Sequence, residues 1–415
     1  MENTLGKQSY SKMKIHFSRN TFIWFLVFLA FVNPAYLDRF SFFGLFTTAT
    51  KLLVFGYFLI FKVFHNKFPK KIVPWLCYAL LPTLTTIIRS GDIRSALIYS
   101  FTIMSSALVF FYVSDRHTKD MVSGLALVME ILVFINMVTI ILVPSGLYIY
   151  ETEAGWWSSD VWFFGLRNSH STFLCLACFS SVIDYYLRGG LLKKILVVIT
   201  HIISVITIIL LSSGGGLVSF AVYFIMLFVL TRKNRINIIP IIVKTRLVVL
   251  INIAIFVFLS FFAANTNFVN IFSLIGEQRV YTMGRRLSIW AAVWEHIPMA
   301  PFWGHGFMKA EELRWLSNLA AGAITSHNSM MDICFRGGLI TFTVYCIMLI
   351  STGVYIDDSR RIDYKIKNYF AASWFAILLL LQSEGAMMSI PLLTIVGLTI
   401  KIGKTVENGK LHVKM

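Results

Sequence analysis

Long, continuous apolar segments follow one another along almost the whole chain, and they limit the folds that it can adopt. We place twelve of them, at residues 21–38, 42–61, 72–88, 95–113, 121–143, 171–187, 195–211, 215–231, 247–264, 330–352, 368–382 and 386–400. A helix that crosses a bilayer needs about 20 mostly apolar residues, whereas the strands of a membrane barrel alternate between apolar and polar residues. With 57% apolar and only 14% charged residues, the chain carries more apolar surface than a soluble fold can bury. The sequence therefore predicts an all-α polytopic membrane protein with about twelve transmembrane helices.

The positions of the basic residues predict the orientation of these helices. With the N-terminus in the cytoplasm, the predicted cytoplasmic segments contain 26 of the 37 lysine and arginine residues. The predicted outer segments contain nine, and five of those nine lie in one segment, 265–329. This distribution follows the positive-inside rule, so topology rather than nucleic-acid binding is the main reason for the net charge of +17. We expect both termini in the cytoplasm, where the basic segments also favour contact with anionic lipid headgroups.

No linker, low-complexity tract or clear repeat divides the chain. We expect a single integral membrane domain, 1–415, with a large extracytoplasmic loop at 265–329 and a smaller one at 145–170. The first apolar segment lacks a small-residue cleavage site, so it is expected to stay in the protein. All five cysteines lie in apolar segments or at their ends, and we interpret the closely spaced Cys175 and Cys178 as packing residues. We predict no disulfide, no metal site and no cofactor.

The predicted large loop, between the ninth and tenth helices, contains two short helical patterns. Apolar residues recur at helical spacing over 286–294, which predicts an amphipathic helix at the membrane surface or over a cavity. A second short helix is predicted at 310–319. Arg285 and Arg286 open the first pattern, and guanidinium groups suit the oxygens of a lipid diphosphate because they stay charged and donate from a rigid fork. Arginines that contact water or lipid headgroups remain the alternative interpretation.

The end of this loop contains Ser326-His327-Asn328-Ser329, directly before the tenth predicted helix. A histidine titrates near pH 6.5 when unperturbed, so His327 is a candidate to accept a proton from a sugar hydroxyl. Asp332 follows at a spacing suited to orienting the imidazole. A histidine that merely caps the helix is an equally simple interpretation.

Several other polar residues fall near the predicted outer surface. Arg167 and His170 end the smaller loop, and Arg167 is a second candidate phosphate clamp. Asp332, Arg336 and Glu384 lie near the outer ends of predicted helices, which favours a site shared with the large loop. Buried polar residues in spans could also form a proton relay of a transporter, but the paired halves and broken helices typical of transporters are not evident in the sequence.

The order of motifs in 284–338 resembles the Wzy-type polysaccharide polymerase and O-antigen ligase superfamily. The motifs are Arg286-Leu287-Ser288-Ile289-Trp290, then Trp303-Gly304-His305-Gly306, then Ser326-His327-Asn328. The resemblance implies a metal-independent, inverting glycosyl transfer from undecaprenyl diphosphate on the outer face of the cytoplasmic membrane. It assigns catalytic roles to Arg286, which holds the leaving diphosphate, and His327, which activates or positions the acceptor hydroxyl.

The resemblance also suggests roles for further residues and shows two departures. Gly304 and Gly306 are expected to be structural, and the diphosphate or glycan is expected to contact Arg285, Arg167, His170, Trp290, Asn328 and Asp332. His170 stands where an asparagine is expected. Many members have an arginine between two apolar segments where this chain has Ser213-Gly214-Gly215, so a second phosphate clamp is missing there. Our hypothesis is that Arg167 or Arg285 replaces it.

These expectations predict a polysaccharide polymerase in the bacterial cytoplasmic membrane. Its donor and acceptor would be undecaprenyl-diphosphate-linked oligosaccharide repeat units, joined into a capsule, exopolysaccharide or O-antigen chain. A chain-length regulator and a flippase are possible protein partners, and the lipid bilayer surrounds the protein. The alternatives are a ligase that moves finished polymer to lipid A core or a cell-wall acceptor, and a transporter of the lipid-linked oligosaccharide.

Overall fold

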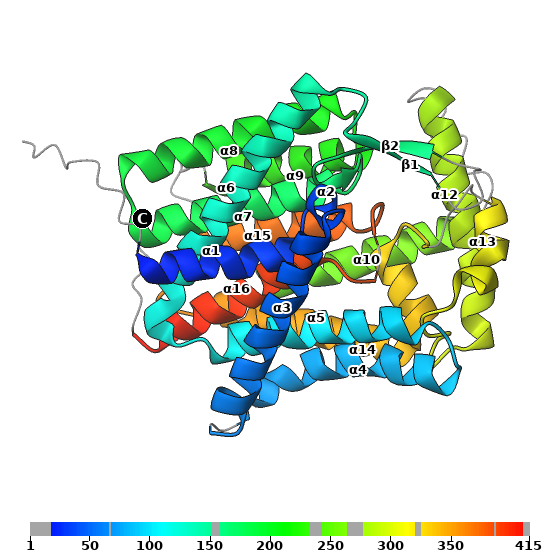
Figure 1. The fold of residues 1–415 in the computed structure, drawn as a ribbon, viewed down its shortest axis with the longest axis horizontal. Helices are drawn as coiled ribbons and strands as arrows, with labels where there is room; N and C mark the ends of the chain where they lie inside the picture. Colours follow the sequence, from blue (N-terminus) through cyan, green and yellow to red (C-terminus); the bar gives the residue numbers. More distant parts are fainter. Residues whose placement is uncertain are drawn as a thin grey trace, which may run out of the picture.

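The computed structural model describes residues 18–65, 68–151, 158–231, 243–263, 277–319, 325–385 and 387–409, and they are mainly helical (Figure 1). The longer helices are α1 (Arg19–Val32), α3 (Ser41–Phe58), α4 (Val73–Ile88), α5 (Ile93–Tyr112), α6 (Thr118–Leu142), α7 (His170–Arg188), α8 (Leu191–Leu210), α9 (Gly214–Thr231), α10 (Thr245–Ala263), α12 (Glu277–His296), α14 (Ser329–Asp357), α15 (Tyr364–Leu380) and α16 (Ile390–Glu407). The shorter elements are the helices α2 (Ala35–Asp38) and α13 (Arg314–Leu319) and the strands β1 (Tyr148–Glu151), β2 (Ser158–Trp162) and β3 (Gly165–Leu166). Single 3-10 or π-helical turns occupy Leu59–Val63, Lys70–Ile72, Asp115–His117, Ile297–Met299 and Ala310–Leu313.

Each of the twelve predicted apolar segments overlaps at least one helix. Six helical stretches of the described residues are long and apolar enough to cross a membrane: Ser41–Val63, Lys70–Ile88, Ile93–Tyr112, Asp115–Leu142, Leu191–Leu210 and Ser329–Asp357. The protein is therefore a helical, multi-pass membrane protein, while the count of twelve spans and their orientation stay predictions. The first predicted segment is divided between α1 and α2, because Asn33 adopts a left-handed conformation (φ 45°) and Pro34 has no N–H to continue the helix.

Helices at the centre of the bundle differ from those at its surface in what they bury. Nearly every side chain of α16 is buried, whereas α3 buries only Thr47 and Phe58. Phe42 and Leu53 of α3 are 82% and 74% exposed. Large apolar side chains exposed along a long helix are unfavourable in water but suit contact with lipid tails. The surface position of α3 in Figure 1 therefore fits a helix that faces the bilayer.

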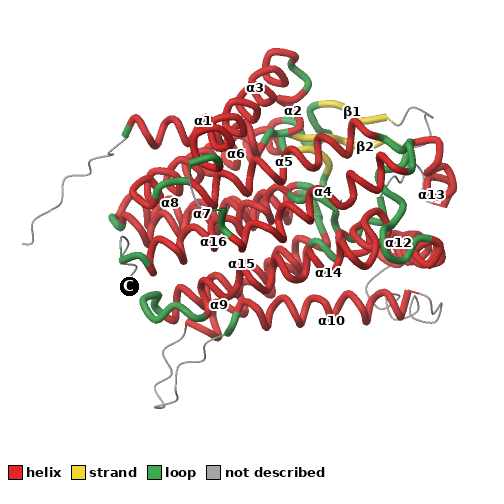
Figure 2. The backbone as a smooth tube through the Cα atoms, turned by 90° about the horizontal axis from the view of Figure 1, so that it is seen from below, coloured by secondary structure: helices red, strands yellow, loops and turns green. Residues whose placement is uncertain are grey.

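The smaller predicted loop, 145–170, contains a sheet that the sequence analysis did not predict. β2 pairs antiparallel with both β1 and β3, with Val161 opposite Tyr148 and Leu166. The short strands lack a long alternating pattern, which is why the segment resembled an irregular loop. β1 and β2 lie at the same end of the bundle as α12 and α13 (Figures 1 and 2), away from the end where α16 finishes (Figure 1).

The described part of the predicted large loop contains two helical segments. The amphipathic helix expected at 286–294 is α12, which begins earlier, at Glu277, and ends at His296 before Pro298. Leu287 and Trp290 of its predicted apolar stripe are buried, together with Ile289, whereas Trp294 at the end of the stripe is 42% exposed. The second expected helix consists of the 3-10 turn Ala310–Leu313 followed by α13. The described part of this loop therefore packs on the helical bundle through the apolar stripe of α12.

Candidate functional site

Arg286 lies in the middle of α12 and forms an ion pair with Glu384, in the turn between α15 and α16. Its Nη2 atom is 3.1 Å from Oε1 of Glu384, and the two side chains are 15% and 10% exposed. The apolar stripe of α12 holds Arg286 at this position, because Leu287 and Trp290 pack into the core. The structure thus places Arg286, the predicted diphosphate-binding residue, against a buried carboxylate. Glu384 was expected to share a site with the large loop, and this contact agrees with that expectation.

The segment around His327 is fixed by hydrogen bonds on both of its sides. The indole N–H of Trp290 donates to the Ser326 carbonyl at 2.8 Å, and the Ser326 N–H donates to Asp332 Oδ1 at 2.8 Å. Asn328 caps α14, because its Oδ1 accepts from the backbone N–H groups of the first two residues after Ser329. His327 lies between these anchors with φ at 53°, a left-handed conformation that is uncommon for residues other than glycine. Such backbone strain persists only where the neighbouring contacts hold it, which is the case here.

These contacts give Trp290, Asn328 and Asp332 roles in positioning the backbone. The Asp332 carboxylate accepts from the Ser326 N–H and lies 3.9 Å from Nε of Arg336. Among the described residues, no hydrogen bond joins Asp332 to the His327 ring, so the expected orientation of the imidazole by Asp332 is not observed. Trp290 is only 1% exposed, which favours an anchoring role over the predicted substrate contact.

The turn between α15 and α16 connects the two candidate catalytic residues. Besides the Glu384 contact with Arg286, the Leu381 carbonyl accepts from the Ser329 N–H at 2.9 Å. The Gln382 side chain accepts from Nδ2 of Asn328 at 3.3 Å. One turn therefore contacts both α12 and the residues that follow His327. Sequence reasoning missed Gln382, although a polar residue in a short turn between two apolar segments was a usable signal.

Two further turns meet the α15–α16 turn from the other side. The Asn168 side chain lies beside the Glu384 carboxyl group and favours its charged form, which lowers its pKa. At the start of α9, a Cβ added to Gly215 would lie 2.5 Å from Oγ of Ser383 and 3.5 Å from Oε1 of Glu384. The glycine-containing turn that lacks the expected arginine thus lies directly beside the Arg286–Glu384 pair. A side chain at position 215 would therefore have to displace the Ser383 hydroxyl group.

Burial shifts the proton affinities of the two titratable groups near Arg286 in opposite directions. Burial raises the pKa of Glu384 to about 7, and the charge and hydrogen bond of Arg286 oppose this shift. Burial also lowers the pKa of His327 to about 4, and the positive charge of Arg286 lowers it further. The imidazole is therefore neutral near pH 7, and the Glu384 carboxyl group is close to its midpoint.

Gly304 and Gly306 form a tight loop against a kink in α14, as the structural role predicted for them requires. Both have positive φ, 73° and 74°, and the helix is interrupted at Gly338, which has φ 68°. A Cβ on Gly304 would lie 2.5 Å from the Arg336 carbonyl oxygen, and one on Gly306 would lie 2.9 Å from Cα of Thr86. The Gly306 N–H donates to the Arg336 carbonyl at 2.8 Å, so the loop satisfies a backbone group that the kink leaves free.

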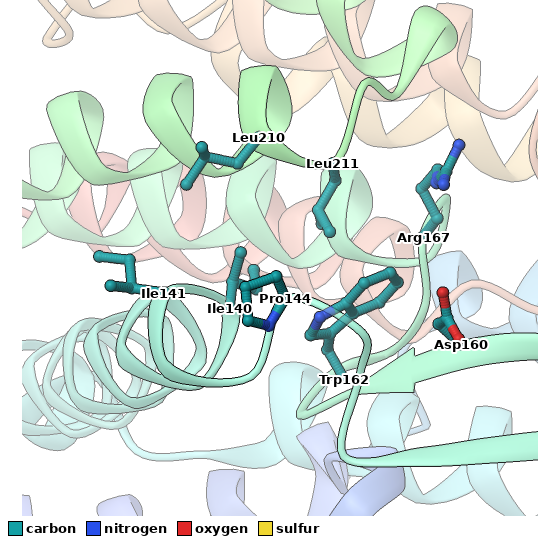
Figure 3. A pocket seen from close by; sticks show the side chains of 8 residues that line it. All are labelled: Ile140, Ile141, Pro144, Asp160, Trp162, Arg167, Leu210 and Leu211. Atoms are coloured by element: carbon teal, nitrogen blue, oxygen red, sulfur yellow. The ribbon is translucent and has the colours of Figure 1, made fainter.

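Arg167 lies at a cavity rather than at the Arg286 ion pair. The cavity has a volume of about 340 Å³ and is lined by Ile140, Ile141, Pro144, Asp160, Trp162, Arg167, Leu210 and Leu211. In Figure 3 the Arg167 guanidinium extends away from Asp160 and Trp162 at the edge of this cavity. Arg167 precedes Asn168, the residue that contacts Glu384, so the cavity and the ion pair lie on either side of one turn.

The two remaining predicted residues do not contribute a described contact to the ion pair. His170 begins α7 and is fully buried, with Nδ1 at hydrogen-bond distance (3.0 Å) from the Leu166 carbonyl and its ring edge-on to Trp162. Arg285 lies in α12, but its side chain is outside the described residues. Within the described ranges, no cluster of three or more histidine, cysteine or acidic residues has the arrangement of a metal site.

A known protein family matches the part of the chain that contains Arg286 and His327. Residues 199–346 match the family model described as O-Antigen ligase. The match runs from α8 into α14 and includes Arg286 and His327, but not Glu384 or Arg167. It confirms the resemblance to the polysaccharide polymerase and O-antigen ligase superfamily. No curated protein matches the chain.

Proposed function

We propose that this chain, with its O-antigen ligase-type segment, is a membrane glycosyltransferase that uses glycans carried on undecaprenyl diphosphate. The observation that carries the proposal is the Arg286–Glu384 ion pair, in which a mostly buried guanidinium already binds an oxyanion next to the His327 segment. Planar guanidinium groups bind carboxylate and phosphate oxygens with the same geometry. A diphosphate at this position would lie close to a neutral imidazole.

The proposed reaction is a direct displacement at the anomeric carbon of the donor sugar. The acceptor hydroxyl oxygen forms the new bond to this carbon as the bond to the diphosphate oxygen breaks, which inverts the configuration. Arg286 stabilises the charge that develops on the leaving diphosphate. His327 accepts the hydroxyl proton or positions the hydroxyl, which its neutral form permits near pH 7. No step of this scheme requires a metal ion.

The first candidate activity is polymerisation of lipid-linked repeat units on the outer face of a bacterial cytoplasmic membrane. In this case both the donor and the acceptor are lipid-linked oligosaccharides. The second candidate is a ligase that transfers finished glycan to lipid A core or a cell-wall acceptor, and the description of the matching family favours it. The two activities differ in the acceptor, whereas the donor side would be the same.

The test uses the full-length protein in lipid nanodiscs with lipid-linked repeat unit extracted from cells that carry the gene. A ladder of longer products from this single substrate would identify a polymerase. No product until a second acceptor is added would identify a ligase. Unchanged glycan together with repeat units that accumulate inside deletion cells would favour the transporter and contradict the proposal.

Single substitutions test the two catalytic assignments. Arg286→Ala removes a charge-assisted contact worth about 1.5–3 kcal/mol, so we expect kcat/KM to fall by about 10- to 150-fold. His327→Ala is expected to lower kcat more than it changes KM. Arg314→Ala is the matched control, because Arg314 is exposed on α13 in the same loop. Wild-type rates in both site variants would refute the assignments.

A further inference from the structure

Glu384 occupies the position at Arg286 that the proposed function assigns to the leaving diphosphate. The carboxylate sits in a turn held by backbone hydrogen bonds, including that from the Glu384 N–H to the Leu380 carbonyl at 2.9 Å. The residue is 7% exposed, so solvent contributes little to stabilising its charge. Its described polar contacts are Arg286 and Asn168.

The described groups around Glu384 provide one positive charge for one negative charge. On α12 the charged group facing it is Arg286, and on the turn before α7 the facing group is the neutral Asn168. On α9 the adjacent residue is Gly215, which has no side chain. His327 lies close enough to Arg286 for the guanidinium charge to act on its ring, and it is neutral near pH 7, because burial and Arg286 lower its pKa to about 4. Among the described residues, the pair is therefore electrically balanced in the empty site.

A bound diphosphate would destroy this balance. Two anions at one guanidinium, about 4 Å apart, would repel each other by about 4 kcal/mol at an effective dielectric constant of 20. A buried carboxylate that loses its cation is also unfavourable, and such groups respond by taking up a proton. Burial already raises the pKa of Glu384 to about 7, so protonation near neutral pH costs little free energy.

We propose that Glu384 is a counter-ion displaced by substrate: it holds Arg286 in the empty site, yields the guanidinium to the lipid diphosphate, and takes up one proton as the ligand binds. The inference rests on the proposed function, because it takes the ligand from there. It assigns Glu384 a positioning role toward Arg286 and couples binding to pH. Because the bound state carries the additional proton, affinity is highest at low pH and falls as pH rises above 7.

The experiment measures binding of a synthetic short-chain prenyl diphosphate sugar to the full-length protein in nanodiscs. This ligand is a diester of diphosphate, so its own charge is constant between about pH 6 and pH 9. The dissociation constant is measured across this range, and calorimetry in two buffers of different ionisation enthalpy gives the number of protons taken up. For the wild type we expect proton uptake near pH 7.5 and a Kd that rises by up to about tenfold per pH unit above pH 7.

Three variants separate Glu384 from other sources of pH dependence. Glu384→Gln keeps the size of the side chain and removes its charge, so we expect tighter binding at high pH and no proton uptake. Glu311 is an exposed acidic residue in the 265–329 loop, and Glu311→Gln is expected to keep the wild-type slope. His327→Gln is also expected to keep the pH slope of Kd, because the histidine is already neutral over this range.

The outcomes distinguish this inference from the proposed function. Arg286-dependent binding without proton uptake in the wild type would overturn the inference and leave the proposed function standing. The same conclusion follows if Glu384→Gln folds and retains the wild-type slope. No binding of the prenyl diphosphate sugar, or binding that Arg286→Ala does not weaken, would overturn both. The calorimetry on the wild type decides the question even if the Glu384 variant does not fold.

Discussion

Trp290 is the residue of the site for which an anchoring role and a substrate contact predict opposite kinetic results. We consider Trp290→Phe, which retains a large aromatic ring and removes the indole N–H. That N–H donates to the Ser326 carbonyl at 2.8 Å, one residue before His327, and the side chain is 1% exposed. The substitution therefore removes one of the contacts that hold the backbone at His327.

The expected loss in the free energy of unfolding follows from the lost hydrogen bond. A net hydrogen bond contributes about 0.5–1.5 kcal/mol, and a buried carbonyl left without a partner costs about 1–3 kcal/mol. We expect the free energy of unfolding to fall by about 1–3 kcal/mol. If the same free energy is lost from the productive placement of His327, kcat falls by about 5- to 150-fold. KM should change little, because the indole does not touch the substrate in this scheme.

The assay combines thermal unfolding with transfer kinetics on the lipid-linked donor. Trp294→Phe is the matched control, because Trp294 is on the same helix but 42% exposed. An unchanged melting temperature together with a raised KM in Trp290→Phe would refute the anchoring role. It would restore the substrate contact that the sequence analysis predicted.

Two further predictions concern folding. Gly304→Ala places a Cβ 2.5 Å from the Arg336 carbonyl oxygen at a left-handed φ of 73°, a backbone conformation that alone costs an alanine about 1–2 kcal/mol. Fluorescence size-exclusion chromatography should therefore show loss of folded protein. Gly44→Ala is the control and should behave as wild type, because a Cβ at this position has nothing within 4 Å. Lys401→Met removes one partner of Asp115, whose Oδ1 is 2.6 Å from a lysine that is 2% exposed. Asp115 is only partly buried and keeps the hydrogen bonds from Thr405 and Asn408, so the free energy of unfolding should fall by about 1–3 kcal/mol. Asp115→Asn added to Lys401→Met should recover part of this loss, and a melting curve without recovery would contradict the assigned pairing.

The helical segments were predictable because apolar length and continuity are local properties of the sequence. The chemistry of a side chain is also a local property, which is why Arg286 and His327 could be named as candidates from the sequence. Breaks within the pattern were less predictable. The left-handed Asn33 before Pro34 divides the first apolar segment, and short strands pair in the 145–170 segment, because both depend on contacts that a run of apolar residues does not specify.

The assignment of partners within the site required the tertiary structure. Sequence spacing suggested that Asp332 orients the His327 imidazole, but the Asp332 carboxylate accepts from the Ser326 backbone instead. Trp290 was expected to contact substrate and is buried as an anchor. Arg167, expected near the diphosphate, lines a cavity on the other side of the Asn168 turn. Side-chain direction depends on how helices pack, and the spacing of residues along one segment does not determine it.

The sequence by itself determined that this is a helical membrane protein with a polar segment containing Arg286 and His327, because hydrophobicity and side-chain chemistry are readable residue by residue. Only the tertiary structure decided that Arg286 meets Glu384, 98 positions later in the chain, and that the same turn contacts the residues following His327. The sequence cannot show this because burial and ion pairing set the charge state of Glu384. Both depend on helices that are distant in sequence and adjacent in the bundle.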